Sequence, residues 1–248
     1  MKRLLFVLLP LLFLQSCSSD GSGTSLSQEG TKVRKRITTL NGGTSVEKFH
    51  YDGSKMVKFT TTLGSTTKYV YEGNLVKKMI TGGSEHVLAY DSQNRVIGKT
   101  VTGYDYEEVY THNADNTIFV ERLDNGQLVS TQMLYYEGGE IVRVENNDLE
   151  NGIWKQSSYE LEYDDKPNYR SEWQGFDKIA HTFALKTFQY GIHHNVVALV
   201  ETTPNVAVPN SAWYEHIYNQ AGHIISTQVV DQDGVYHGLS YTYFYEGQ

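Results

Sequence analysis

The chain has 248 residues, of which 21 are basic and 29 acidic, and its formal net charge is −8. Nucleic-acid-binding proteins need a basic face that displaces counterions from phosphates, so this charge argues against that class and against an electrostatic membrane anchor. The chain has 19 Tyr and 22 Gly but only 4 Pro, a composition that favours strands and turns.

Residues 1–17 have the pattern of a lipoprotein signal peptide. Basic residues follow Met1, and the apolar run over 4–14 is shorter than the ~20 residues that a membrane-spanning helix needs. The next residues, Leu14-Gln15-Ser16-Cys17, resemble the lipobox of bacterial lipoproteins, in which the Cys is acylated. The alternative is an ordinary signal peptide with a chance Cys. Cys17 is the only cysteine, so no disulfide can form within the chain.

Residues 18–31 are polar, rich in Gly and Ser and without periodicity, which predicts a flexible tether. We expect one all-β domain over 32–248, held at the outer membrane by a lipid on Cys17. Asp20 alone is a weak surface-export signal. The prediction therefore allows either the periplasmic or the surface face of that membrane.

From residue 32 onward, short β-rich runs alternate with two kinds of turn signal. One kind is short and centred on Gly, and its Asn-Gly and Asp-Gly pairs suit type I′ hairpins. The other kind follows an aromatic residue. The Gly-centred signals lie at 41–43, 64–65, 82–83, 125–126, 151–152 and 233–234, and the aromatic signals begin at Tyr51, Tyr71, Tyr90, Tyr136, Tyr163, Tyr218 and Tyr245.

The aromatic signals recur about every 20 to 28 residues, so each unit is one hairpin. A single hairpin cannot bury its own apolar face, and neighbouring units must pair sideways around a shared core. The sequence predicts an antiparallel meander of roughly 16 to 18 strands, either a strongly twisted open sheet or a barrel-like one. The exceptions are 164–190, predicted as a long loop with a short helix near Phe176, and 203–209, whose two prolines exclude a central strand.

The aromatic-acid-Gly units resemble divergent YD (Rhs-type) repeats, which form spiralling antiparallel sheets in large toxins and cell-surface proteins. The lipobox, the tether and the element Tyr163-Asp164-Asp165-Lys166-Pro167-Asn168 together resemble a family of Gram-negative lipoproteins known as a domain of unknown function. In that family an Asn-Val strand follows the loop, and Asn195-Val196 stands at the matching place. The resemblance spans roughly 32–248. It implies architecture and location but no activity.

Motifs for catalysis are missing from the sequence. It has no Gly-x-Ser-x-Gly, no His-Glu-x-x-His and no pair of cysteines, so we predict no enzyme activity, no metal and no cofactor. Two alternatives stay open. His216 and His223 flank the turn at Tyr218 with Glu215 nearby, which indicates either a metal site or a solvated hairpin. Glu160 and Glu162 share a strand face, as in a glycosidase pair or a solvated surface.

The aromatic residues of the second half favour a binding role. Rings on an acidic protein can stack on sugars or receive the side chains of a partner protein, although they can equally pack a core beneath the loops. We predict a non-enzymatic binding or scaffold module for a glycan or an envelope protein; the alternatives are a structural role in envelope assembly and a carbohydrate-active enzyme. The candidate binding surface comprises Trp154, Trp173, Trp213, Tyr169, Tyr214 and Phe176.

Overall fold

The computed structural model describes residues 31–184, 188–204, 206 and 210–247. The signal peptide, Cys17 and nearly all of the tether lie outside the described residues. Among those described, no helix is long and apolar enough to cross a membrane.

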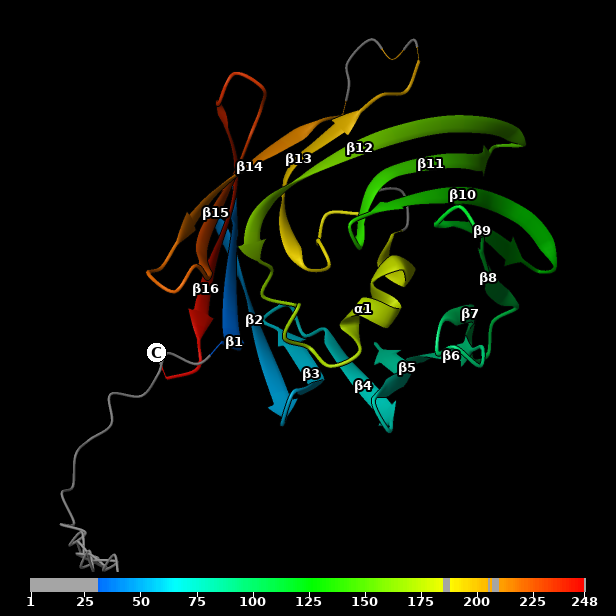
Figure 1. Ribbon diagram of the computed structural model, residues 1–248, viewed down its shortest axis with the longest axis horizontal. Coiled ribbons are helices and arrows are strands. Elements are labelled where there is room, and N and C mark those ends of the chain that lie inside the picture. Colours follow the sequence, from blue (N-terminus) through cyan, green and yellow to red (C-terminus); the bar gives the residue numbers. More distant parts are fainter. Residues whose placement is uncertain (1–30, 185–187, 205, 207–209, 248) are drawn as a thin grey trace, which may run out of the picture.

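Sixteen antiparallel strands follow one another around a closed barrel (Figure 1). The ring closes where β1 pairs with β16, from Val33 opposite Tyr245 to Leu40 opposite Leu239. The predicted meander and its number of strands are confirmed, whereas the alternative of an open sheet of YD-like hairpins is wrong. The strands are β1 (Val33–Leu40), β2 (Gly43–Asp52), β3 (Lys55–Thr61), β4 (Thr66–Glu72), β5 (Leu75–Thr81), β6 (Ser84–Tyr90), β7 (Val96–Val101), β8 (Tyr106–His112), β9 (Thr117–Asp124), β10 (Gln127–Glu137), β11 (Glu140–Glu150), β12 (Ile153–Pro167), β13 (His194–Glu201), β14 (Ala212–Tyr218), β15 (Ile224–Val230) and β16 (Tyr236–Tyr245).

The two kinds of turn occupy opposite ends of the barrel. We call the end with the turns after Asp52, Glu72, Tyr90, His112 and Glu137 the tyrosine rim, and the end with the turns after Leu40, Thr61, Thr81, Val101, Asp124 and Glu150 the glycine rim. At the glycine rim, Asn125 and Gly126 both have positive φ, at 50° and 69°, as a type I′ turn requires. At Asp233-Gly234 only the Gly has positive φ, and the carboxylate of Asp231 instead accepts the N–H groups of Asp233 and Val235.

The repeated aromatic residues fasten the hairpins at the tyrosine rim. Each of these hairpins turns at the glycine rim, so its open end lies at the tyrosine rim. There the aromatic side chain near the end of the second strand forms a hydrogen bond with a backbone carbonyl near the start of the first strand. A β-bulge directly before Tyr51, Tyr71, Tyr90 and Tyr163 re-aims the ring. The bonds are Tyr51 to Val33 at 3.0 Å, Tyr71 to Met56 at 3.1 Å, Tyr90 to Val76 at 2.5 Å, His112 to Val96 at 2.8 Å, Tyr163 to Ile141 at 2.6 Å and Tyr245 to Ile224 at 2.8 Å.

Residues 168–184 and 188–193 lie inside the barrel, and we call them the plug (Figure 1). It contains the short helix α1 (Phe176–Ile179) and the 3₁₀ turn η1 (Ala180–Phe183). The predicted short helix is therefore confirmed, but the loop fills the lumen instead of lying over one face or end of the sheet. A sixteen-stranded barrel has an interior too wide for wall side chains to fill, and the plug supplies the missing core.

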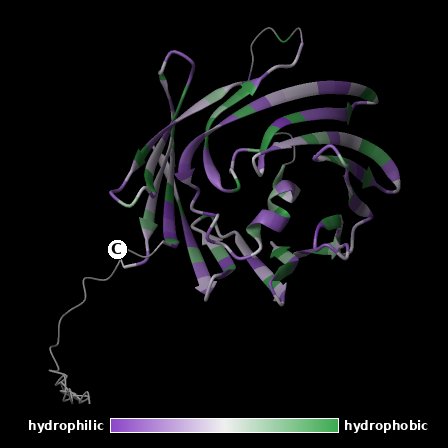
Figure 2. Ribbon diagram, viewed as in Figure 1, coloured by the Kyte–Doolittle hydropathy of each residue, from purple (hydrophilic) through white to green (hydrophobic). Residues whose placement is uncertain are grey.

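Side chains alternate between the lumen and the outer surface along each strand, and Figure 2 shows the resulting bands of hydropathy. Phe49 and Tyr243 meet plug rings, so they point inward, and their strand neighbours point outward. The outward set includes charged residues between the two rims: Lys48, Lys58 and Lys68 on β2–β4, and Glu107, Glu121, Glu145 and Glu160 on β8, β9, β11 and β12. A membrane-spanning barrel has an apolar band on this face. Here charged residues interrupt that band, although apolar residues such as Val70 and Phe119 share the same face.

Candidate functional site

A cavity of about 440 Å³ lies between the plug and the wall formed by β3–β8. Half-buried His86 and Tyr106 lie on its glycine-rim side, and Thr182, Phe183 and Tyr190 of the plug form the opposite side. The remaining lining residues are Phe59, Thr67, Tyr69, Met79, Thr81, Lys99 and Glu108. Rings and a thioether thus share the cavity with hydroxyl, imidazole and charged groups.

A buried ion pair borders this cavity. Lys99 Nζ lies 2.7 Å from Glu108 Oε1, and the side chains are 8% and 1% exposed. Tyr106 donates its hydroxyl hydrogen to Glu108 at 2.9 Å, and Tyr110 donates to the other carboxylate oxygen. Lys99 also donates to the plug carbonyl of Thr182 at 3.3 Å. The pair therefore joins wall to plug beside the cavity.

Burial and charge act in opposite directions on the pKa values of Glu108 and Lys99. Burial disfavours the carboxylate of Glu108, but Lys99, Tyr110 and Arg122 outweigh burial and keep its pKa below the usual value. Burial lowers the pKa of Lys99, and Glu108 counteracts that effect. Burial, with a smaller contribution from Lys99, likewise lowers the pKa of His86. The cavity thus presents neutral and ionic hydrogen-bonding groups side by side.

The polar lining continues around the lumen from β9 to β12. Arg122 donates to Ala184 of the plug at 2.8 Å, to Gln132 at 3.0 Å and to Ser130 at 3.2 Å. Gln132 then donates to the side chain of Asn146, at 2.7 Å. These bonds fix the plug against the second half of the wall.

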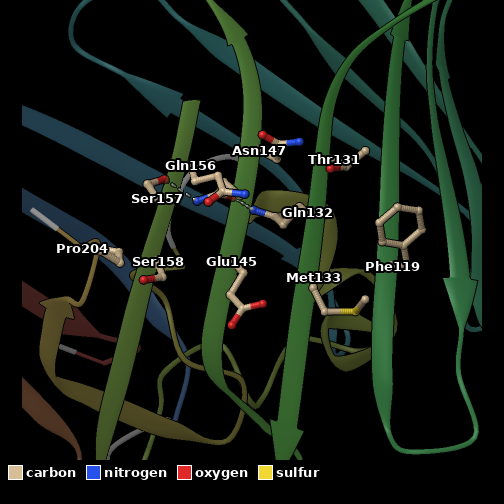
Figure 3. Close-up of a pocket in the computed structure, with 11 residues that line it drawn as sticks. Phe119, Thr131, Gln132, Met133, Glu145, Asn147, Gln156, Ser157, Ser158 and Pro204 are labelled. Carbon is tan, nitrogen blue, oxygen red and sulfur yellow. Dashed lines mark hydrogen bonds between the residues drawn. The ribbon is translucent and has the colours of Figure 1, made fainter. Parts of the chain in front are cut away.

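A second depression, of about 400 Å³, lies on the outer face of the same strands (Figure 3). Met133 and Phe119 project into it beside Glu145, and Pro204 of the β13–β14 connection borders it. The other side chains on this face are short and polar: Thr131, Asn147, Gln156 and Ser158. It is lined by the wall and the β13–β14 connection, whereas the lumen cavity lies between the wall and the plug.

The structure separates the six predicted binding aromatics. Tyr169, Trp173 and Phe176 belong to the plug and are buried, at 5%, 7% and 3% exposed. Their rings pack in series, 5.9 Å and 5.4 Å apart, and Trp173 donates to Tyr51. These three are therefore core residues of the lumen and do not form a surface.

The other three lie apart on the wall. Trp154 is 42% exposed at the glycine rim, where it stands opposite Leu149. Trp213 and Tyr214 are neighbours on β14, where Trp213 has the outward register opposite Ala198 and Tyr214 lines the same lumen pocket as Tyr169 of the plug. The six residues do not form one continuous binding surface.

The alternative catalytic and metal residues do not converge either. Glu160 and Glu162 lie on the outer wall beside Arg143 and Tyr135. His216 points inward to Thr227 and the carbonyl of Val196. Over the described parts of the chain, no group of three or more His, Cys, Asp or Glu residues is placed to hold a metal ion.

Lys99, Glu108 and Arg122 were missed by sequence reasoning. A signal was present in β8, where Glu108 shares its face with Tyr106 and Tyr110 and is therefore an acid on the apolar side of the strand. An acid in that position needs a buried cation. Which cation supplies the charge depends on the register of β7 and β9, which the sequence does not reveal.

No protein-family model and no curated protein matches the chain. Two solved structures are similar in fold, a porin-like protein from Bacteroides vulgatus and another from Bacteroides uniformis. The first has a TM-score of 0.61 and 14% identity, and the second 0.56 and 13%. Each comparison covers 88% of this chain and 99% of the other. At this identity the likeness concerns the fold alone.

Proposed function

We propose that this protein is a non-enzymatic binding protein of the cell envelope, anchored by a lipid on Cys17, and that its ligand site is the lumen cavity beside Lys99 and Glu108. The observation that carries the proposal is the cavity of about 440 Å³, closed on one side by the plug. Small-molecule sites have volumes of ~300–1,000 Å³ and combine apolar walls with a few placed polar groups.

A short glycan suits this lining. Phe59, Tyr69 and Phe183 offer rings on which a sugar face can pack, and Thr67, Tyr106 and Lys99 offer hydrogen-bonding groups. The ion pair is satisfied without a ligand, so the cavity recognises hydroxyl groups through an existing network and needs no metal ion for that purpose.

The lumen and the outer wall argue against a channel embedded in lipid. The plug occupies the lumen, and outward residues such as Lys58 and Glu121 would lie within the hydrocarbon of a bilayer. Lys or Arg on that face costs up to ~2–4 kcal/mol at the midplane. We therefore place the barrel in water, although its fold is similar to that of the two porin-like structures.

The test is a glycan-array screen on the chain carrying Cys17→Ser, followed by two matched variants. Met79→Trp adds bulk inside the cavity, whereas Met133→Trp adds the same bulk on the outer wall. A specific glycan whose binding is lost in Met79→Trp and kept in Met133→Trp supports the site. A folded protein that binds no glycan, or loses binding only in Met133→Trp, overturns it.

The anchor has a separate test. Membrane fractionation of cells that express the wild-type chain or Cys17→Ser should place the first with the outer membrane and release the second. Equal distribution of the two forms would contradict lipid anchoring. The proposed ligand cavity would be unaffected by that result, because the glycan screen tests it separately.

A further inference from the structure

One side of the outer wall carries a row of lysines. Five consecutive strands, β1 to β5, each place a lysine on the outward face, and we call these five residues, with the wall that bears them, the lysine wall. Neighbouring strands lie ~4.8 Å apart, so the row extends about 20 Å around the barrel. Its members are Lys35, Lys48, Lys58, Lys68 and Lys78.

Several of these lysines face one another directly. Lys35 is the register partner of Lys48, and Lys58 that of Lys68. Like charges in directly opposite positions destabilise a sheet. Over the described residues, Lys48, Lys58 and Lys68 have no ion-pair or hydrogen-bond partner, while Lys78 pairs with Glu85 of β6 at 2.7 Å. Three of the five lysines are therefore an uncompensated concentration of positive charge at the centre of the row.

The acidic residues of β1–β5 do not neutralise this row. Glu47 points inward and pairs with Arg36, and Asp52 and Glu72 lie at the strand ends on the tyrosine rim. The excess acid of the chain is elsewhere, including the outward Glu107, Glu121 and Glu160 on β8, β9 and β12. A protein with net charge −8 thus has one basic side.

The position of the row favours a membrane as its partner. The chain enters β1 at the tyrosine rim after residues 1–30, so the lysine wall begins on the strand that continues from the tether. Leu40 and Leu63, 54% and 82% exposed, stand at the glycine-rim ends of the same strands. Apolar tips beside a basic face suit the boundary between head groups and acyl chains. A hydrophilic polyanion would make no use of those tips.

From this geometry we infer that the lysine wall lies on an anionic lipid surface, with the lysine ammonium groups against phosphate-bearing head groups. The inference rests on the anchoring in the proposed function, because a lipid on Cys17 would hold the barrel close to that surface. It adds an orientation: the barrel rests on its β1–β5 side. An acyl anchor and a basic patch together bind membranes more firmly than either alone.

The test uses the full chain with Cys17→Ser, so that only the wall can bind. Co-sedimentation compares phosphatidylcholine vesicles with vesicles that also contain phosphatidylglycerol, at low and at physiological ionic strength. The test variant is Lys48→Gln/Lys58→Gln/Lys68→Gln. The matched control, Lys155→Gln/Lys166→Gln/Lys178→Gln, makes the same change in net charge at exposed lysines elsewhere.

We expect binding only to the anionic vesicles, weakened by salt. One lysine near such a surface contributes roughly a fivefold factor in partition coefficient, so the triple variant should lose about a hundredfold and the control much less. No binding by the parent chain, or equal losses in both variants, overturns the inference. The inference is also overturned if sedimentation velocity shows that the chain forms a dimer through the lysine wall. A failure of acylation in cells would affect only the proposed anchor, and the vesicle result would stand.

Discussion

The carboxylate of Asp164 accepts the backbone N–H of Asn195 at 3.1 Å, which joins the strand before the plug to the strand after it. The same carboxylate accepts the N–H of Lys166 at 3.0 Å and the hydroxyl of Tyr218. Asn168 completes the junction, because its backbone N–H donates to the carbonyl of His193 at 2.7 Å. Both ends of the plug are therefore held at one point on the tyrosine rim.

Replacing Asp164 by Ala should destabilise the whole barrel. The change leaves several half-buried donors without an acceptor, and each such loss costs about 1–3 kcal/mol. We expect a decrease of about 2–4 kcal/mol in the free energy of unfolding, measured by urea denaturation. The control is Asp165→Ala next to it, whose side chain is 85% exposed. A variant at Asp164 as stable as that control would show that the junction does not hold the plug.

The ion pair of Lys99 and Glu108 can be examined by a double-mutant cycle. Either single variant, Lys99→Met or Glu108→Leu, leaves one buried charge without its partner, which typically costs about 3–5 kcal/mol. The double variant should regain part of this loss, because it removes both charges. Urea denaturation of the four proteins gives the coupling free energy. Strict additivity of the two single losses would mean that the pair is not coupled.

His181 should make the protein less stable in mild acid. Burial, with smaller effects of His112 and Lys99, lowers the pKa of His181 to about 3. The unfolded chain therefore takes up a proton at this histidine near pH 6.5, while the folded protein does not. The stability that the neutral His181 contributes is fully present above pH 6.5 and is lost progressively as the pH falls from about 6.5 to 3.

The measurement is the free energy of unfolding against pH. The loss due to His181 approaches about 1.4 kcal/mol per pH unit below 6.5, and His181→Gln should reduce that slope by this amount. His50→Gln, at an exposed position on the outer wall, is the control. A slope that His181→Gln leaves unchanged would contradict a neutral, buried imidazole.

Each tyrosine at the tyrosine rim should contribute a modest, separable stabilisation. Tyr71→Phe removes only the hydroxyl that donates to the carbonyl of Met56 at 3.1 Å. A hydrogen bond of this kind contributes about 0.5–1.5 kcal/mol, so thermal or urea unfolding should shift by that amount. Tyr104→Phe, at a tyrosine that is 69% exposed, should change nothing. Equal effects at both positions would argue against the fastening role.

The residues of the turns made the meander predictable, but they did not predict that the sheet closes into a barrel. The positions of Asn125-Gly126 and of the Tyr71 unit in the sequence mark where strands end, since few residues suit those conformations. Closure depends on the register summed over sixteen pairs and on their twist, and neither is a local property. The sequence therefore allowed both an open sheet and a barrel.

The site was less predictable for the same reason. Trp173 and Phe176 have the composition of a binding loop, and their burial follows only from the loop entering the lumen. Lys99 and Glu108 are nine positions apart in sequence and ordinary in type; they pair because β7 and β8 place them opposite each other. The lysine wall also depends on register, which gathers on one side charges that the net total hides.

Because the plug leaves and rejoins the wall at neighbouring points, it is topologically an insertion between two consecutive strands of a ring. The wall closes through β1 and β16, far along the chain from that insertion. Evolution can therefore exchange the segment that defines the interior without altering the pairing of any strand. In such a design the plug side of the cavity can vary while the wall stays the same, whereas a change of register in β3–β5 would affect both the cavity lining and the lysine wall.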